Sequence, residues 1–266
     1  MSRLAGVFAD LKSNGRKGVI PYVVAGDPTP EGTVDLLHQL VAAGADVLEV
    51  GVPFSDPMSE GPVIQKGHER ALENGMTLRK VLEIVAAFRR DNQNTPVVMM
   101  GYANPIERFG YDAFAGACAE AGVDGLITVD LPPEEVDQID LALQAVSLDN
   151  IFLISPTTPE SRIQTIVDRA RGFIYCVAVK GVTGSGQLDP EAVAQATTVI
   201  GFDDRNNAGF TATSAAIEDA GGLMVAQLWH PGRQQLWHPT KSPAGVSDGP
   251  DPYSWTVAHV MDNDEI

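Results

Sequence analysis

The chain has 266 residues and carries 18 Lys or Arg against 35 Asp or Glu, a formal net charge of −17. This acidic balance argues against nucleic acids and anionic membranes as partners, because both are bound through basic surfaces. It has two cysteines, no apolar run near the ~20 residues of a membrane span, and a length suited to one barrel of ~250 residues, which together predict a single cytoplasmic domain.

The chain alternates between short apolar runs and helical patterns up to about residue 198. It starts with an amphipathic pattern over residues 2–13, which lacks the apolar core of a signal peptide. The expected strands are 19–25, 46–52, 97–101, 124–129, 151–155 and 173–180, and the expected helices are 29–44, 62–74, 78–90, 108–121, 134–145 and 159–171. This alternation predicts parallel βαβ units in an α/β fold, either a (β/α)8 barrel or an open doubly wound sheet.

Polar or turn residues stand at the same end of all six predicted strands. Asp27 follows the first strand, Asp130 follows the fourth and Lys180 ends the sixth. Barrel enzymes place their active sites at this end of the sheet. The first strand is not followed by the GxGxxG pattern of dinucleotide-binding proteins. The pattern therefore favours a barrel with a catalytic face.

Two glutamates are the main candidates for chemistry. Glu49 lies within an apolar strand pattern, where an unpaired carboxylate is unfavourable. If the Glu49 side chain faces the mouth of a barrel, burial would raise its pKa and suit it to proton transfer. A structural ion pair between Glu49 and a Lys or Arg is an equally good interpretation. Glu60, in the loop 55–61, could make a second proton transfer. From the pattern alone, a solvated loop charge is the favoured interpretation of Glu60.

The pattern changes after residue 198. All three Trp and three of the five His lie after residue 228. We expect a helix at about 212–220 and a strand at 222–228 that can serve as a seventh strand. The chain from about residue 229 is expected to be largely irregular, and 255–261 is a poor candidate for an eighth strand.

Six segments resemble the tryptophan synthase alpha subunit family, in its order and spacing. They are PYVVAGDP (21–28), GADVLEVGVPFSDPMSEGPVIQ (44–65), MGYANPI (100–106), GVDGLITVDLPPEE (122–135), ISPTTPE (154–160) and KGVTGSG (180–186). The resemblance covers about residues 1–198 and implies a TIM-type (β/α)8 barrel. It also implies a lyase of tryptophan biosynthesis that cleaves indole-3-glycerol phosphate to indole and glyceraldehyde 3-phosphate. The implied partner is a pyridoxal-phosphate beta subunit in an alpha2-beta2 heterotetramer, with no cofactor or metal in this chain.

The resemblance also implies roles for individual residues. Glu49 would protonate the indole carbon, and Glu60, where the family usually has Asp, would take a proton from a glycerol hydroxyl. The residues that match the substrate site are Tyr22, Met100, Tyr102, Ile127, Val129, Tyr175, Thr183 and Gly184. The residues that match the surface facing the beta subunit are Asp56, Pro57, Asn104 and Pro132.

The likeness ends before the last strands of the family. There, a Gly-Phe-Gly turn and a later Gly-Ser turn hold most of the substrate phosphate. In this chain Gly201-Phe202 is followed by Asp203-Asp204, whose charges would repel a phosphate, and no Gly-Ser turn follows. We therefore expect an atypical, incomplete C-terminal closure and impaired phosphate binding.

The C-terminal segment resembles a different family. GGLMVAQLWHPGRQ (221–234) is similar to the old yellow enzyme family of FMN-dependent oxidoreductases, in which the residue matching Gln227 contacts FMN. The simplest interpretation is a chimera of segments 1–198 and 199–266, with the junction between about 198 and 212. Three functions stay open: an alpha-type lyase, a non-catalytic protein that binds the beta subunit, and an FMN-binding fragment.

Overall fold

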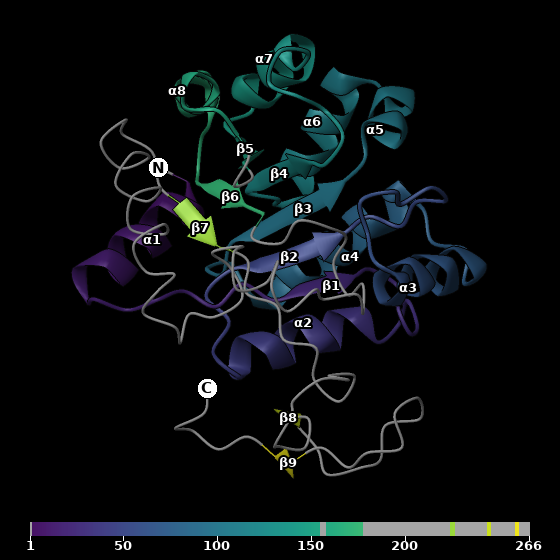
Figure 1. Ribbon diagram of the computed structural model, residues 1–266. Helices are drawn as coiled ribbons and strands as arrows, with labels where there is room; N and C mark the ends of the chain where they lie inside the picture. Colours follow the sequence, from purple (N-terminus) through teal and green to yellow (C-terminus); the bar gives the residue numbers. More distant parts are fainter. Residues whose placement is uncertain (1, 155–157, 178–223, 227–243, 246–258, 261–266) are drawn as a thin grey trace.

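The computed structural model describes residues 2–154, 158–177, 224–226, 244–245 and 259–260 (Figure 1). Seven parallel strands form one sheet, and their order in the sheet is their order in the chain. This arrangement confirms the predicted βαβ units. Within the described residues no strand joins β7 to β1. The elements are α1 (Arg3–Ser13), β1 (Tyr22–Val24), α2 (Thr33–Ala42), β2 (Leu48–Gly51), α3 (Pro62–Glu73), α4 (Leu78–Asp91), β3 (Val97–Gly101), α5 (Ala103–Phe109), α6 (Tyr111–Ala121), β4 (Gly125–Thr128), α7 (Asp137–Ala145), β5 (Asp149–Ile154), α8 (Glu160–Arg169), β6 (Ile174–Cys176) and β7 (Met224–Ala226).

Successive side chains of a strand point to opposite faces of the sheet. Both faces of this sheet are lined with apolar side chains. On the outer face, residues such as Leu48 and Val50 pack against the surrounding helices in one large core. The alternate residues form a second core on the inner face. Its fully buried members include Val47, Val98, Ile127 and Ile151. Strands buried on both faces explain the continuous apolar runs of the sequence.

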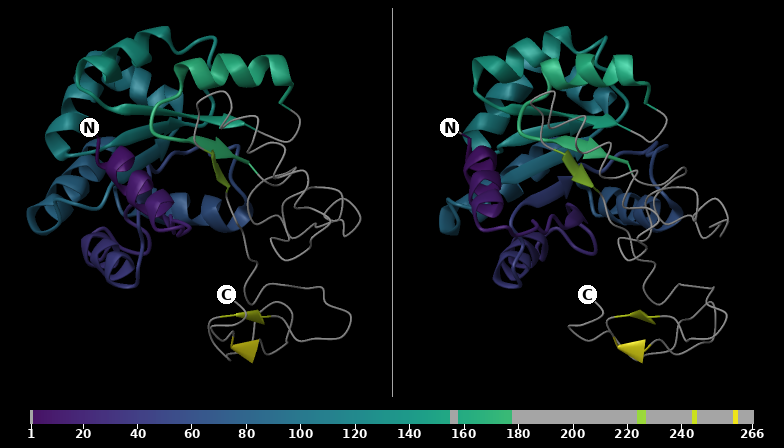
Figure 2. Two further views of the ribbon diagram at one scale, coloured as in Figure 1. Left: turned by 90° about the vertical axis from the view of Figure 1, so that its left-hand side faces the viewer. Right: turned by 60° about the vertical axis from the view of Figure 1, so that its left-hand side comes forward.

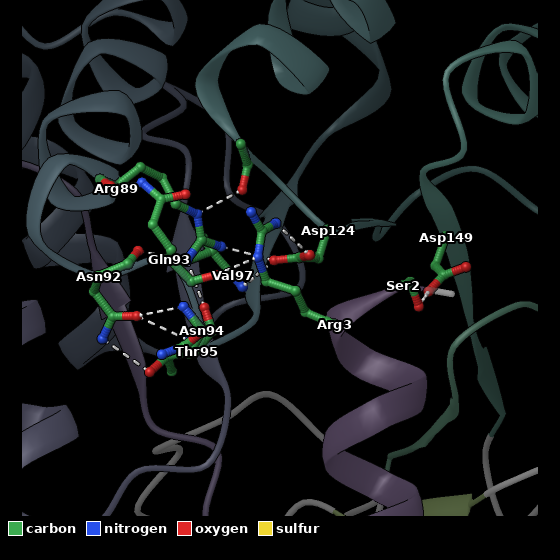
Figure 3. Close-up of polar contacts among 11 residues, drawn as sticks. Ser2, Arg3, Arg89, Asn92, Gln93, Asn94, Thr95, Val97, Asp124 and Asp149 are labelled. Atoms are coloured by element: carbon green, nitrogen blue, oxygen red, sulfur yellow. Dashed lines mark hydrogen bonds and ion pairs between the residues drawn. The ribbon is translucent and has the colours of Figure 1, made fainter.

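Helix α1 closes the end of the sheet at which the strands begin (Figures 1 and 2). Leu4 is completely buried in the inner core, and the ring of Phe8 meets the ring of Phe173 edge-on, with centroids 5.4 Å apart. The Ser2 hydroxyl caps the helix and donates to Asp149 Oδ2 at 2.7 Å (Figure 3). Helix α1 therefore covers the inner face at the end where the strands begin.

A buried ion-pair network lies at the same end (Figure 3). Asp124 Oδ2 accepts from Arg89 Nη2 at 2.7 Å and from the Val97 amide at 2.8 Å. Asp124 Oδ1 accepts from Arg3 Nη1 at 2.9 Å. Burial lowers the pKa of Arg89 to about 10, so its guanidinium stays charged at neutral pH. The network joins α1, α4, β3 and β4 far from the C-terminal strand ends.

The structure differs from the sequence prediction in the third βα unit. The expected helix 108–121 is two helices, α5 and α6, that meet at Gly110. Gly110 has φ 90°, a conformation that interrupts a helix and that glycine adopts at little cost. Helix α5 starts at Ala103, and Pro105 is tolerated because it lies in the first turn.

The C-terminal predictions have mixed outcomes. The expected strand 222–228 contains β7, which pairs with β6 as the seventh strand. Within 255–261, β9 (His259–Val260) pairs with β8 (Ala244–Gly245) in a separate two-stranded sheet and not in the main sheet. The expected helix 212–220, the junction at 198–212 and most of the tail after residue 229 lie outside the described residues.

Candidate active site

The inner face carries a group of polar and aromatic side chains beyond the apolar inner core. Tyr22 of β1 stands in register with Glu49 of β2, so the two side chains share a face. Val47, two residues before Glu49, belongs to the inner core. Because residues two apart in a strand point to the same side, Glu49 and Tyr22 lie on the inner face of the sheet. The predicted substrate-site residues that pack with the same inner core are Met100, Ile127, Val129 and Tyr175.

Glu49 is a buried carboxyl group without a compensating charge in the described part of the chain. It is 3% exposed, and its Oε1 has no hydrogen-bond partner among the described residues. No Lys or Arg in that part forms an ion pair with it. Burial raises the pKa of Glu49 to about 8, and the charge of Glu60 adds to this rise. At neutral pH Glu49 is therefore mainly protonated.

Glu60 is buried, so its interpretation as a solvated loop charge is wrong. It is 6% exposed, and burial raises its pKa. The loop between β2 and α3 turns inward because its backbone is held at several points. The Glu60 amide donates to Pro57 O at 3.0 Å, Gln65 Nε2 donates to Glu60 O at 2.8 Å, and the Ser59 amide donates to Tyr102 Oη at 3.2 Å.

Three tyrosines accompany the two carboxyl groups. Burial raises the pKa of Tyr22 well above its ordinary value, and the charges of Glu60 and Glu49 raise it further. Burial, Glu49 and Glu60 also raise the pKa of Tyr175. Of these groups, Tyr22 and Glu49 stand opposite each other on neighbouring strands. Tyr102 is buried beside them and stacks on Phe54, with ring centroids 5.1 Å apart.

Sequence reasoning missed two kinds of residue at this site. Leu153 and Val177 pack with the inner core. They stand two positions after Ile151 and Tyr175, so the period-two pattern of a strand could have revealed them. His68 of α3 is 2% exposed and contacts Tyr22, and nothing in the sequence analysis singled it out.

The predicted partner surface lies at the C-terminal ends of the strands. Asp56 and Pro57 follow β2, Asn104 stands in the first turn of α5 after β3, and Pro132 follows β4. Asp56 and Asn104 are exposed. Met58 in the same loop is 71% exposed. Loops after neighbouring parallel strands meet at one edge, so these residues share one face of the molecule.

Part of the predicted site cannot be placed. Thr183, Gly184 and Gln227 lie outside the described residues. Across the part of the chain that is described, no three His, Cys, Asp or Glu side chains are grouped as metal ligands. None of the helices in that part is long and apolar enough to cross a bilayer.

Comparison with known proteins identifies the family. A family model described as tryptophan synthase alpha chain matches residues 8–206. The chain belongs to the tryptophan synthase alpha chain family. Its likeness to that family, expected from six sequence segments, is thereby confirmed.

Individual members of the tryptophan synthase alpha chain family show the extent of the likeness. The alpha chain of Marinobacter nauticus is 55% identical over 195 residues, which are 73% of this chain and 72% of that protein. The alpha chain of Chromobacterium violaceum is 51% identical over 228 residues, or 82% and 86% of the two chains.

Solved structures of the same family share the fold. The crystal structure of the alpha chain of Legionella pneumophila is 41% identical with a TM-score of 0.66, covering 89% of this chain and 86% of that one. A chain from the tryptophan synthase α2β2 complex of Pyrococcus furiosus is 32% identical with a TM-score of 0.63, covering 82% and 88%. The barrel-type α/β fold is therefore common to this chain and its relatives.

Proposed function

We propose that this chain cleaves indole-3-glycerol phosphate to indole and glyceraldehyde 3-phosphate, as the alpha chain of a tryptophan synthase. The observation that carries the proposal is the pair of buried carboxyl groups, Glu49 and Glu60, on the inner face of a sheet whose sequence matches this family. The reaction is a retro-aldol cleavage that needs proton transfers and no cofactor in this chain.

The two glutamates suit the two proton transfers of this reaction. Glu60 takes the proton of the glycerol hydroxyl on the substrate carbon next to the indole ring. This hydroxyl becomes the aldehyde carbonyl as the carbon–carbon bond breaks. The electron pair of that bond passes to the indole ring, whose carbon accepts the proton of Glu49. When two carboxyl groups of a site have different pKa values, the group with the higher pKa stays protonated and can act as the acid. The other group is ionised and can act as the base. The higher pKa of Glu49, about 8, makes it the acid.

Apolar and aromatic side chains provide the site for the indole ring. Met100, Ile127 and Val129 line the inner face next to Glu49, and Tyr175 and Tyr102 flank them. These side chains exclude water, which strengthens electrostatic interactions inside the site. The predicted contacts of Thr183 and Gly184 with the substrate phosphate remain part of the proposal.

The proposed mechanism predicts a bell-shaped dependence of kcat/KM on pH. Activity should rise with pH as Glu60 ionises, and it should fall about tenfold per unit above pH ~8 as Glu49 loses its proton. Because the two carboxyl groups interact, the two apparent pKa values belong to the pair. Initial rates of indole release between pH 5 and 10 measure the profile. A rate that stays constant from pH 7 to 10 would contradict the role of Glu49 as the acid.

The direct test is indole release from indole-3-glycerol phosphate, with and without a purified beta subunit. We expect release that the beta subunit stimulates, with KM above that of an intact family member because Asp203-Asp204 replace part of the phosphate site. No release under either condition would overturn the proposal. A stable complex with the beta subunit but no release would favour the alternative of a non-catalytic binding protein.

We further infer that the beta subunit binds at the face formed by Asp56, Pro57, Asn104 and Pro132. The support is that these loops share one edge of the sheet and that Met58 is exposed among them. The α2β2 assembly of the Pyrococcus furiosus relative fits the same proposal.

We also infer that residues 199–266 are a unit of different origin, with a fragment similar to the old yellow enzyme family. In support, the family model matches residues 8–206 and none of the residues after 206. Absorbance of the purified protein tests whether this unit binds flavin. We expect no flavin band after incubation with FMN and gel filtration, because the remainder of an FMN site has no counterpart in the sequence.

A further inference from the structure

The loop between β2 and α3 carries Glu60 and is joined to the rest of the fold at few points. Hydrogen bonds within the loop, such as that from the Glu60 amide to Pro57 O at 3.0 Å, shape it but do not attach it to other elements. In the described part of the chain, the side chains that attach residues 54–60 to other elements by hydrogen bonds are His68, Gln65 and Tyr102. The burial of Glu60 therefore depends on these attachments.

Helix α3 supplies two of these attachments. Gln65 and His68 stand three residues apart and therefore share a face of the helix. Side chains of a helix tilt toward its N-terminus, which here is the end joined to the loop. Gln65 Nε2 donates to Glu60 O at 2.8 Å, and His68 Nδ1 accepts from the Phe54 amide at 3.1 Å. The two side chains thus hold both ends of the segment 54–60 to α3.

His68 makes its contact with the loop as a neutral imidazole. Because Nδ1 accepts from the Phe54 amide, the ring hydrogen is on Nε2, which lies 3.3 Å from Tyr22 Oη of β1. Burial lowers the pKa of His68, an effect that the nearby Asp27 opposes. Asp27 forms an ion pair with Arg70 of α3, with Arg70 Nε 2.7 Å from Asp27 Oδ1. These contacts fix α3 to β1, so the helix is a firm support for the loop.

The Glu60 carboxyl group has no cation to hold it in place within the described part of the chain. None of the Lys and Arg side chains there forms an ion pair with it. The titratable groups on which its charge acts are all acidic: Glu49 of β2, Tyr22 of β1, Tyr102 after β3 and Tyr175 of β6. An ionised carboxylate is more stable in water than in such surroundings, so the loop attachments must oppose an outward turn of Glu60.

Building on the proposed function, we propose that Gln65 and His68 are positioning residues that hold the loop between β2 and α3, so that Glu60 stays buried at the site as the base. Neither side chain needs to touch the reacting atoms, because both act through the backbone of the loop. Gln65 bonds to Glu60 itself, and His68 bonds to the chain six residues earlier. Proton transfer requires a base in a defined position, and the two attachments provide it.

A titration of the carboxyl groups tests this proposal without any activity measurement. Protein with ¹³C-labelled glutamate carboxyl groups would be titrated by NMR, and E49Q and E60Q would assign the two signals. In Q65M and in H68L the pKa of Glu60 should fall toward its ordinary value of 4.5, because the released carboxyl group reaches water. The pKa of Glu49 should stay well above 4.5, since its own burial is the main cause of its rise. An unchanged Glu60 titration in the folded variants, or equal falls for both carboxyl groups, would overturn the proposal.

Three further variants serve as controls for this titration. H68Q, whose amide oxygen can accept from the Phe54 amide, should return the pKa of Glu60 close to that of the wild type. Q144M removes an amide on α7 that donates to Asp140 Oδ2 at 2.8 Å, and H38L removes a histidine of α2 that stacks on Phe88. Both should leave the Glu60 titration unchanged. Gln65 is only partly buried, so Q65M decides the outcome by itself if H68L does not fold.

Kinetics provide a second readout. In Q65M and in H68L, kcat should fall about tenfold with KM nearly unchanged, because the base is misplaced while the substrate site is kept. The acidic limb of kcat/KM should move to lower pH, since Glu60 then ionises at lower pH. H68Q should restore most of kcat. A higher KM with unchanged kcat in Q65M would contradict a positioning role.

The two readouts separate this inference from the proposed function. If the wild-type chain releases no indole but Q65M and H68L lower the pKa of Glu60, the proposed function fails and the hold of Gln65 and His68 on Glu60 stands. If the wild-type chain is active but the Glu60 titration is the same in all variants, the positioning role fails and the function stands.

Discussion

At the scale of single residues, the protonation of Glu49 links its proposed role in catalysis to the stability of the fold. The folded state binds a proton on Glu49 up to a pKa of about 8, whereas the unfolded chain releases it near 4.5. The folded state therefore binds more protons than the unfolded state between these two pH values. By linkage, this group makes the protein progressively less stable as pH rises through that window.

E49Q is accordingly expected to be inactive yet more stable than the wild type. Loss of the proposed general acid should lower kcat by about 10²- to 10⁴-fold. The stability gain should be small at pH 5 and grow to a few kcal/mol by pH 8, since one pKa unit corresponds to about 1.4 kcal/mol. Urea denaturation at pH 5, 7 and 9 measures the difference. If E49Q and the wild type keep a constant difference across this range, the raised pKa of Glu49 is wrong.

Gly51 provides a second test at this scale, because Tyr22 occupies the space of its missing side chain. A Cβ at this position would lie 2.2 Å from Tyr22 Oη and 2.6 Å from Cζ, so G51A must displace the ring. We expect a loss of about 1–3 kcal/mol in the free energy of unfolding and a fall in kcat. G116A is the control, since its Cβ in α6 would meet nothing within 4 Å. Equal effects of the two substitutions would contradict this account.

The sequence revealed the chemistry of single residues unevenly. The apolar run around Glu49 predicts a buried strand, so its unusual environment can be inferred from neighbours in the chain. Glu60 lies in a polar loop, and its burial depends on contacts with Tyr102 and Gln65 that no local pattern contains. His68 lies at helical spacing from Ile64 and Ala71, so the helical pattern places it on the packed side of α3. Its partner Tyr22 could not be predicted, because it comes from β1.

At the scale of elements, the ion-pair network of Asp124 explains how α1 and α4 are fixed to the start of β3 and β4. Asp124 and Arg89 are both nearly inaccessible, with side-chain exposures of 4% and 6%. Removing one member of a buried pair leaves the other charge without compensation. The contribution of this network to the free energy of unfolding is therefore best measured by removing one of its charged side chains.

D124A is expected to lower the free energy of unfolding by about 3–5 kcal/mol, because the Arg89 charge stays buried without its partner. Urea denaturation at pH 7 measures the loss. E134A is the matched control, since it removes a carboxylate from the Arg162–Glu134 pair, which is exposed on both sides, and it should change stability little. In D124A, kcat at 20 °C should remain close to that of the wild type, because the network lies at the far end of the strands. A fall in kcat without a loss of stability would contradict this separation.

Element boundaries were predictable where a local signal exists. Helix α4 runs from Leu78 to Asp91, close to the expected 78–90, because the Thr77 side chain caps its start by accepting from the Lys80 amide. The division of the third unit into α5 and α6 was not predicted, since a glycine within a helical pattern does not by itself reveal a positive φ. The conformation of Gly110 follows from how both helices pack on the sheet, which is tertiary information.

At the scale of the whole molecule, one end of the sheet is closed by α1 and the other carries the candidate site and the proposed partner face. Met58 is an exposed apolar side chain on that face. Met58 lies in the loop of Asp56 and Pro57, two of the residues proposed to face the beta subunit. The proposed complex with a beta subunit can therefore be tested by changing this one side chain.

M58D is expected to weaken association with the beta subunit at least tenfold without unfolding the chain, because the added charge would be desolvated at the interface. L141D is the control. Leu141, on α7, is 68% exposed, similar to Met58 at 71%, but it lies outside the proposed partner face. Surface plasmon resonance with immobilised beta subunit measures both affinities. Equal affinities of M58D and L141D would place the interface elsewhere.

The fixed position of α1 has a consequence for how the chain is made. The strands pair in the order in which they are synthesised, so each new unit can add to the edge left by the previous one. Helix α1 is made before all of these strands, and its partners are spread along the chain, from Asp124 beside Arg3 to Phe173 beside Phe8. The contacts of α1 can therefore form only in stages as synthesis proceeds. The edge-on contact between Phe8 and Phe173 becomes possible only after the fifth strand has been made.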